Sequence, residues 1–269
     1  MPRADPKSDP CDAERMPTPM DARESQVPLS SSQIDHNEVV EAILARHSTR
    51  TGYVDRRIDE PILKEIVRAG LAAPSSKNAQ PWRLHVVSDR TVLGVLAEAV
   101  RRAPDADRYV PHDPNTGRPW PQYVSTVRES AEVLAQVSTG VFIENLGIFS
   151  GGRQTLVSVA RDGLVGSLVG YTLEAVGIGA AVQNMWVAAN ALGVQAAFMG
   201  DILIAEDEIR RYLGLTGDLI GVLALGYADT PQGPRRSLDL DDPTRVKWHG
   251  SAGHDNTRSE LGGPATGTT

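Results

Sequence analysis

Two short stretches, RHSTR at residues 46–50 and APSSKNAQPW at residues 73–82, decide how this sequence folds and what it can hold. The first places two guanidinium groups and a hydroxyl within five residues, a donor set suited to a phosphate. The second ends a predicted helix and turns just before a predicted strand, so its hydroxyl and amide groups can face a planar polar molecule. A phosphate joined to a hydrogen-bonding heterocycle describes flavin mononucleotide (FMN), whose chemistry is redox chemistry.

Composition outside these stretches favours one folded domain between two polar tails. Residues 1–35 are rich in proline, serine, aspartate and arginine, and residues 250–269 are rich in glycine, serine and threonine. Both tails are predicted to be disordered, because they offer almost no apolar run to bury. The intervening residues 36–249 suit a single α/β or α+β domain, which is the predicted FMN-binding domain.

Charge and cysteine content exclude several other classes of protein. The formal net charge is −7 without a basic stripe, which disfavours nucleic-acid binding. One cysteine, Cys11, excludes an intrachain disulfide and a cysteine-based metal cluster, and the histidines outside RHSTR lack metal-ligand spacing, so no metal is expected. No secretory signal is recognisable, and the apolar stretch 164–198 is interrupted by Glu174 and by several amide side chains. We therefore expect a cytoplasmic protein with small-molecule partners.

Helical and strand periodicities alternate along the chain. Helices are expected at 36–46, 59–73, 89–102, 122–135, 166–192 and 206–213, and strands at 83–88, 138–143, 194–199 and 219–226. No two strands form a clean hairpin, so a mixed sheet with helices on both faces is expected. Residues 144–163 fit neither period, and the small-sided 166–192 helix suits the middle of a domain or a dimer interface.

A long proline-rich stretch at 103–121 is expected to be functional or mobile. Trp120 lies in it and Tyr123 just after it, and each suits either a surface anchor or a substrate lid. With Phe198, at the end of a predicted strand, they are the candidate substrate-binding residues.

These stretches, with others in the same order, resemble the nitroreductase family of FMN-dependent oxidoreductases over residues 40–248. The further motifs are a long helix with Gln183-Asn184, QAAFMGD at 195–201, LGY at 225–227 with PRR at 234–236, and VKWH at 246–249. The resemblance implies an α+β nitroreductase-like mixed sheet flanked by helices, in a homodimer whose two chains both touch each flavin. It departs at Met199-Gly200, where family members often have Glu-Gly, and in the N-terminal extension.

The resemblance also implies the contacts to the flavin. Residues 46–50 would hold its phosphate with the basic pair at 235–236, residues 74–80 would contact its ring and ribityl chain, and the backbone at 199–200 would face N5. The candidate cofactor-binding residues are therefore Arg46, His47, Ser48, Arg50, Pro74, Ser75, Ser76, Asn78, Gln80, Met199, Gly200, Arg235 and Arg236. A solvated helix end or a satisfied turn is the structural alternative for most of them. Trp82 is expected in the core, and no side chain is expected to act as a catalytic acid or base.

The implied function is reduction of nitroaromatic or quinone-like acceptors with NADH or NADPH, by a ping-pong hydride transfer through the flavin. A branch resembling 5,6-dimethylbenzimidazole synthase, which fragments reduced flavin, is the enzymatic alternative. The iodotyrosine branch is disfavoured because its lid uses a lysine and no lysine lies between Lys77 and Lys247. A flavin-binding protein without turnover and a flavin-free interaction module are the alternatives from other classes.

Overall fold

The computed structural model describes residues 37–229 and 242–249, in two compact units that divide after Leu44. The helix α2 (Glu38–Ala45), which belongs to the first unit as far as Leu44, begins behind Asn37, whose side-chain oxygen accepts hydrogen bonds from the backbone of Val39 and Val40. The two predicted tails, and with them Cys11, lie outside the described residues, as do Arg235 and Arg236.

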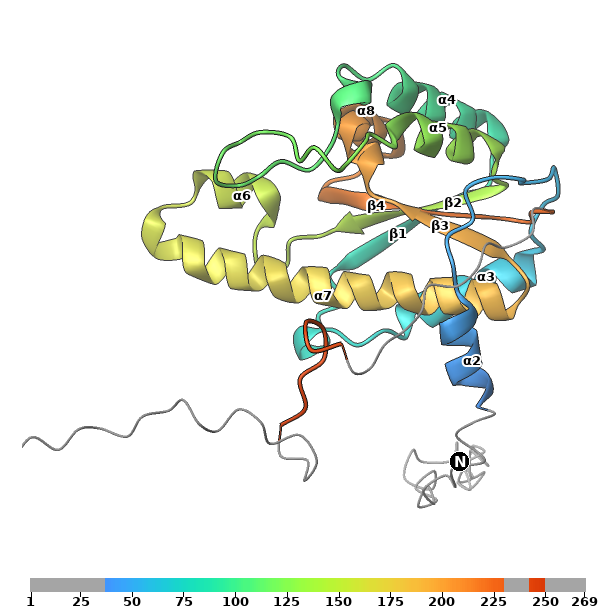
Figure 1. Cartoon of the computed structure of the whole chain (residues 1–269), viewed down its shortest axis with the longest axis horizontal. Coiled ribbons are helices and arrows are strands. Elements are labelled where there is room, and N and C mark those ends of the chain that lie inside the picture. Colours follow the sequence, from blue (N-terminus) through green and yellow to red (C-terminus); the bar gives the residue numbers. More distant parts are fainter. Residues whose placement is uncertain (1–36, 230–241, 250–269) are drawn as a thin grey trace, which may run out of the picture. The chain divides into compact units, whose positions relative to one another are not determined.

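A four-stranded sheet forms the centre of the second unit (Figure 1). Its strands, in spatial order, are β1 (Trp82–Val87), β2 (Thr139–Asn145), β4 (Asp218–Gly226) and β3 (Gln195–Met199). Each neighbouring pair is antiparallel. The α+β class is therefore confirmed, whereas the described strands of the expected mixed sheet contain antiparallel pairs alone.

The mixed sheet was expected because no two strands form a clean hairpin, but the antiparallel pairs join strands that long connections separate in the sequence. Every residue of β2 is buried, including the polar residues Thr139, Glu144 and Asn145. Here the two covered faces come from helices that pack on both sides of an antiparallel sheet. Trp82, at the start of β1, is 6% exposed and belongs to the core, as expected.

Helices cover both faces of the sheet (Figure 1). They are α3 (Glu60–Leu71), α4 (Arg90–Arg101), α5 (Val127–Gln136), α6 (Gly152–Ser158), α7 (Arg161–Ala191) and α8 (Glu206–Leu213). Three 3-10 turns accompany them, at Ser76–Asn78, Ala106–Arg108 and Asp201–Ala205. The predicted helices and strands all form, with ends that differ by a few residues.

Alternation along β4 divides its side chains between two cores. Val222 and Ala224 pack with residues of α4, α5 and α8 on one face. Leu223 and Leu225 pack with residues of α3 and α7 on the other. The candidate site is built mainly on the second face.

The longest helix, α7, packs closely against α3. A Cβ built on Gly70 of α3 would lie 2.5 Å from Cγ of Met185, and Asn184 Nδ2 donates to the carbonyl oxygen of Ala69 at 3.1 Å. Length and composition alone would let α7 cross a membrane, although 33% of its most apolar window is buried inside the protein. The glycine explains how the two helices approach so closely.

The segment between β2 and α7, which fitted neither period, contains α6. It is held by distant carboxylates: Glu174 of α7 is buried and accepts from the backbone of Phe149 (2.6 Å) and Ser150 (3.0 Å), while Asp218 accepts from the backbone of Arg153 (2.7 Å). Burial opposes ionisation of Glu174, but hydrogen bonds from Ser150, Asn145 and Phe149 outweigh it and lower its pKa.

Candidate functional site

The RHSTR segment is tied to both α7 and β3 by its backbone. Trp186 Nε1 donates to the carbonyl oxygen of His47 (3.1 Å), and the Thr49 N–H donates to the carbonyl oxygen of Ala196 (3.0 Å). The hydroxyl of Tyr53 donates to the carbonyl oxygen of Thr49 (2.7 Å). Side chains at 46, 48 and 50 therefore project from a backbone that is fixed at three points.

The cations of this segment remain available to an anion. Cζ of Arg46 lies 4.3 Å from the ring centroid of Trp186, and no carboxylate in the described part of the chain pairs with it. Arg50 Nε lies 3.9 Å from Glu129 Oε2, but both side chains are 45% exposed, so this ion pair is weak. The Ser48 side chain makes no hydrogen bond to another described residue.

The ring of His47 is occupied within its own segment. Nδ1 lies 3.2 Å from the carbonyl oxygen of Ala45, and Nε2 lies 3.0 Å from Oγ1 of Thr49. A neutral ring protonated on Nδ1, with the Thr49 hydroxyl donating to Nε2, satisfies both contacts. His47 therefore braces the turn around Ser48, and its flavin contact stays a prediction.

The second segment is a strained turn. Lys77, Asn78 and Gln80 have positive φ angles of 53°, 53° and 48°, which non-glycine residues rarely adopt. Ser75 holds the turn: its Oγ accepts from Gln80 N at 2.9 Å, and its carbonyl oxygen accepts from Asn78 N at 3.0 Å. Such strain collects at ligand-binding sites, where it fixes side chains in a required direction.

Two side-chain amides of this turn are left unpaired by the described part of the chain. Asn78 and Gln80 are exposed, and their side chains make no hydrogen bond to the rest of the described chain. Pro74 is exposed, and Ser75 and Ser76 are half-buried. The turn thus offers hydrogen-bonding groups to a ligand that the single chain does not itself satisfy.

One helix supports both segments. A Cβ added to Gly177 of α7 would lie 3.3 Å from Cβ of Ser75, whereas Trp186, on the same helix, contacts Arg46 and His47. Nine residues of helix separate these contacts, which is about 14 Å. The structure therefore places the two segments on one scaffold but at a distance comparable with the length of a flavin mononucleotide.

The third expected element, the end of β3, lies beside the base of the long loop. Met199 is 3% exposed, with its side chain in the core, so its backbone is the part that can face a ligand. Phe198 is half-buried against Gly221, where an added Cβ would lie 2.6 Å from the ring. Gly200 precedes Asp201, whose Oδ2 accepts from the hydroxyl of Thr126 at 2.7 Å.

The loop at 103–126 is folded on itself. His112 and Pro119 form an isolated antiparallel bridge, and Trp120 N donates to the carbonyl oxygen of Pro111 at 3.0 Å. Trp120 is 37% exposed and Tyr123 is 53% exposed. The end of the loop is fixed beside Asp201, and the role of these aromatic side chains, as a surface anchor or a substrate lid, stays a prediction.

Sequence reasoning missed a buried carboxylate on β2. Glu144 Oε1 accepts from Thr216 N (2.7 Å), Thr216 Oγ1 (3.0 Å) and Gly217 N (2.5 Å), and Oε2 lies 2.8 Å from His85 Nε2 and 3.2 Å from an Arg83 nitrogen. Burial raises the pKa of Glu144, but the hydrogen bonds from Gly217, His85 and Thr216 prevail and lower it to about 2. No local pattern marks this site, because its donors are distant in sequence.

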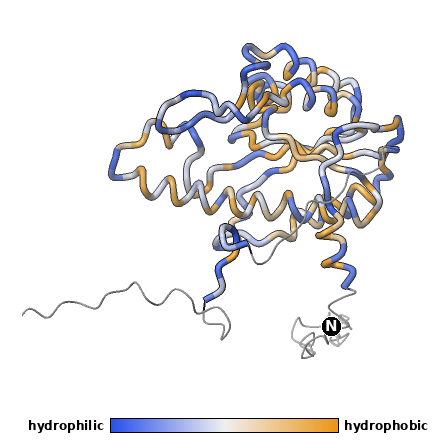
Figure 2. The backbone as a smooth tube through the Cα atoms, in the orientation of Figure 1, coloured by the Kyte–Doolittle hydropathy of each residue, from blue (hydrophilic) through white to orange (hydrophobic). Residues whose placement is uncertain are grey.

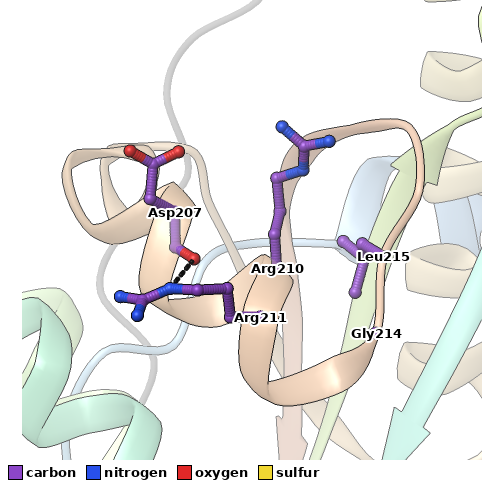
Figure 3. A pocket seen from close by; sticks show the side chains of 5 residues that line it. All are labelled: Asp207, Arg210, Arg211, Gly214 and Leu215. Carbon is purple, nitrogen blue, oxygen red and sulfur yellow. Dashed lines mark hydrogen bonds between the residues drawn. The ribbon is translucent and has the colours of Figure 1, made fainter.

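Two pockets lie along α8, and none of the candidate residues lines them. The one in Figure 3, of about 560 Å³, is lined by Asp207, Arg210, Arg211, Gly214 and Leu215. Arg211 Nε donates to the backbone carbonyl of Asp207 at 3.1 Å, and Arg210 points away from that bond. The candidate site is therefore an exposed surface along α7 in the single chain rather than one of these pockets.

The residues along α7 fit FMN by their chemistry. The cations at 46 and 50 suit a phosphate, and the free amides at 78 and 80 suit the ring edge. Among the described residues, no group of three or more His, Cys, Asp or Glu side chains could hold a metal ion. Arg235 and Arg236 lie outside the described residues.

Known proteins match most of this chain. A model of the nitroreductase family matches residues 43–227, which include both segments. An Archaeoglobus fulgidus protein named as a candidate NADH dehydrogenase/NAD(P)H nitroreductase is 29% identical over 150 residues, 52% of this chain and 84% of that protein.

Two solved structures share the fold. An FMN-bound nitroreductase of Bacteroides fragilis is 22% identical with a TM-score of 0.56, over 79% of this chain and 100% of that one. An NADPH:FMN oxidoreductase of Vibrio harveyi, complexed with NAD⁺, is 20% identical with a TM-score of 0.53, over 79% of this chain and 77% of that one.

Proposed function

The chain belongs to the nitroreductase family of oxidoreductases, and we propose that it uses FMN and NADH or NADPH to reduce nitroaromatic or quinone-like acceptors. The observation that carries the proposal is a pair of polar segments packed against α7. Among the described residues, Arg46 has no carboxylate partner, and the side-chain amides of Asn78 and Gln80 make no hydrogen bond. The proteins named above, which bind FMN or NAD⁺, support the same choice of cofactors.

In this proposal the phosphate of FMN binds to Arg46, Ser48 and Arg50. The chain also allows Arg235 and Arg236 to take part. Asp229 N donates to the carbonyl oxygen of Gly52 at 3.0 Å, so the chain leaves the described fold beside the RHSTR segment. Arg235 and Arg236 lie outside the described residues, and their contact with the phosphate is proposed from the sequence alone.

FMN, held by these residues, would supply the hydride-transfer chemistry between NADH or NADPH and the acceptor. The chain contributes binding and orientation. The strained turn at 75–80 presents its amides to the ring, and the backbone at Met199 and Gly200 would orient the ring edge. No side-chain acid or base is assigned to the site, so the proton for the acceptor would come from water.

The proposal includes a homodimer. The N-terminal half of α7 exposes large apolar side chains, with exposed fractions between 41% and 69%, at Val165, Leu168, Val169, Leu173 and Val176. Figure 2 shows that hydrophobic positions recur along the whole of α7. An apolar face of this extent favours a protein contact, and a second copy would cover the open surface beside the turn at 75–80.

The remaining parts of the proposal follow the sequence. A small-molecule acceptor is the expected partner, without nucleic acid or a membrane, and the expected location is the cytoplasm. Residues 36–249 form the FMN-binding domain, and residues 1–35 and 250–269 are tails outside it.

The test is an absorbance spectrum of the purified protein, followed by anaerobic addition of NADPH or NADH and then of a nitroaromatic compound. We expect a yellow protein that bleaches with the nicotinamide and regains its colour with the acceptor. The variant Arg46→Ala should bind FMN more weakly, whereas Arg68→Ala should not, because Arg68 pairs with Glu65 on the exposed face of α3. A colourless protein that takes up no FMN would contradict the proposal, and yellow protein that no nicotinamide bleaches would favour flavin fragmentation or storage.

A further inference from the structure

Trp186 contacts two neighbouring residues of the RHSTR segment with different parts of one indole. Its Nε1–H donates to the carbonyl oxygen of His47 at 3.1 Å, and its ring lies under the guanidinium of Arg46 at 4.3 Å. The side chain is half-buried and packs with the core between the sheet, α3 and α7. A side chain packed against the core thus contacts both the backbone and a cation of the segment.

The ring contact leaves the guanidinium able to bind. A guanidinium that stacks on an aromatic face keeps its N–H donors in its own plane, directed away from the ring. No carboxylate among residues 37–229 and 242–249 forms an ion pair with Arg46, so those donors are not taken by one. Arg50 differs, because Glu129 lies 3.9 Å from its Nε.

The backbone contact fixes where the donors point. The carbonyl oxygen of His47 accepts a hydrogen bond from Trp186, and the N–H of Thr49 donates to the carbonyl oxygen of Ala196 in β3. An arginine that is already stacked on a fixed ring loses less rotamer freedom when it binds an anion, which raises affinity without a new contact to the ligand.

We propose that Trp186 is a positioning residue for the flavin phosphate, holding Arg46 flat and the His47 carbonyl in place so that the RHSTR segment is formed before the cofactor binds. This inference rests on the proposed function. It predicts an effect on phosphate recognition that a general role in stability would not produce. Riboflavin, which has the same ring and no phosphate, separates the two.

The experiment uses the full-length chain after removal of its flavin, titrated with FMN and with riboflavin by fluorescence. Trp186→Leu removes both contacts, and Trp186→Phe keeps a ring face and removes the N–H donor. Val182→Ala is the matched control, since Val182 lies one turn away on α7 in the same core. We expect Trp186→Leu to weaken FMN roughly tenfold and to leave riboflavin within about twofold. Trp186→Phe should fall between, and Val182→Ala should not change the ratio of the two dissociation constants.

A second measurement isolates the contact with Arg46. If the indole positions Arg46, then Arg46→Ala should weaken FMN less in the Trp186→Leu background than in the wild-type protein. Equal weakening of FMN and riboflavin by Trp186→Leu, unchanged FMN affinity, or strictly additive effects of the two substitutions would overturn the inference and leave the proposed function standing. A wild-type protein that binds neither flavin would overturn both.

Discussion

Glu144 is expected to make the stability of the fold depend on pH, and the substitution Glu144→Gln tests this. The carboxylate is fully buried and accepts from Thr216, Gly217 and His85, which lower its pKa from 4.5 to about 2. A folded-state pKa below the unfolded one means that the group stabilises the fold above pH 4.5 and that this contribution is lost as the pH falls toward 2. The difference between a pKa of 4.5 and one of about 2 corresponds to about 3 kcal/mol of folding free energy at neutral pH.

The assay is urea unfolding of wild type and Glu144→Gln at fixed protein and flavin concentrations, between pH 7.5 and pH 3. We expect the variant to be less stable by about 3 kcal/mol at pH 7.5, because glutamine loses the charge and turns an amide toward donors. The difference should shrink as the pH falls below 4.5. Glu60→Gln is the control: Glu60 is an exposed partner of Lys64, so its loss should leave stability unchanged. Parallel pH profiles for wild type and Glu144→Gln would refute the reasoning.

Three further predictions concern α7. Gly179→Ala should stabilise the protein by up to about 1 kcal/mol through helix propensity, since an added Cβ meets nothing within 4 Å. Gly177→Ala should gain less, because its Cβ would lie 3.3 Å from Cβ of Ser75. Thermal unfolding compares the two variants, and equal gains in stability would contradict the packing argument. Glu174→Ala should cost about 2–4 kcal/mol, because it leaves buried donors of the 145–150 segment unpaired, as the urea midpoint will report; a loss below 1 kcal/mol would contradict that role. Val169→Lys with Val176→Lys should convert a dimer to a monomer in light scattering after size exclusion, and an unchanged mass would place the interface elsewhere.

Local signals were enough to predict most of the fold. Apolar periodicity located the helices and strands. The structure adds a cap at the start of α4 that was not predicted: the Asp89 side chain accepts from Thr91 N (2.7 Å) and Val92 N (3.3 Å). The α6 segment was missed because its anchors, Glu174 and Asp218, act over distances in sequence that no local window covers. The mixed sheet was expected because no two strands form a hairpin; the antiparallel partners are instead strands that helices separate in the sequence, so no tight turn marks their direction.

The candidate site divides in the same way. The segments at 46–50 and 73–82 are recognisable because their residue types and spacing are unusual. Trp186 was not singled out, because an aromatic residue in an apolar helix usually belongs to the core. Glu144 was not singled out either, since its hydrogen-bond donor Thr216 lies 72 residues away in the sequence. Residues whose partners are remote become visible once the chain is folded.

Because α7 contacts both segments, the number of residues between Gly177 and Trp186 sets the angle around the helix axis between these two contacts. Deleting one residue there would rotate the two contacts by about 100° relative to each other and shorten their separation by about 1.5 Å. Either the indole or the glycine surface would then face away from its segment. Insertions and deletions should therefore be tolerated near residue 161, where α7 begins, and should be selected against between these two positions, however conservative the new residue.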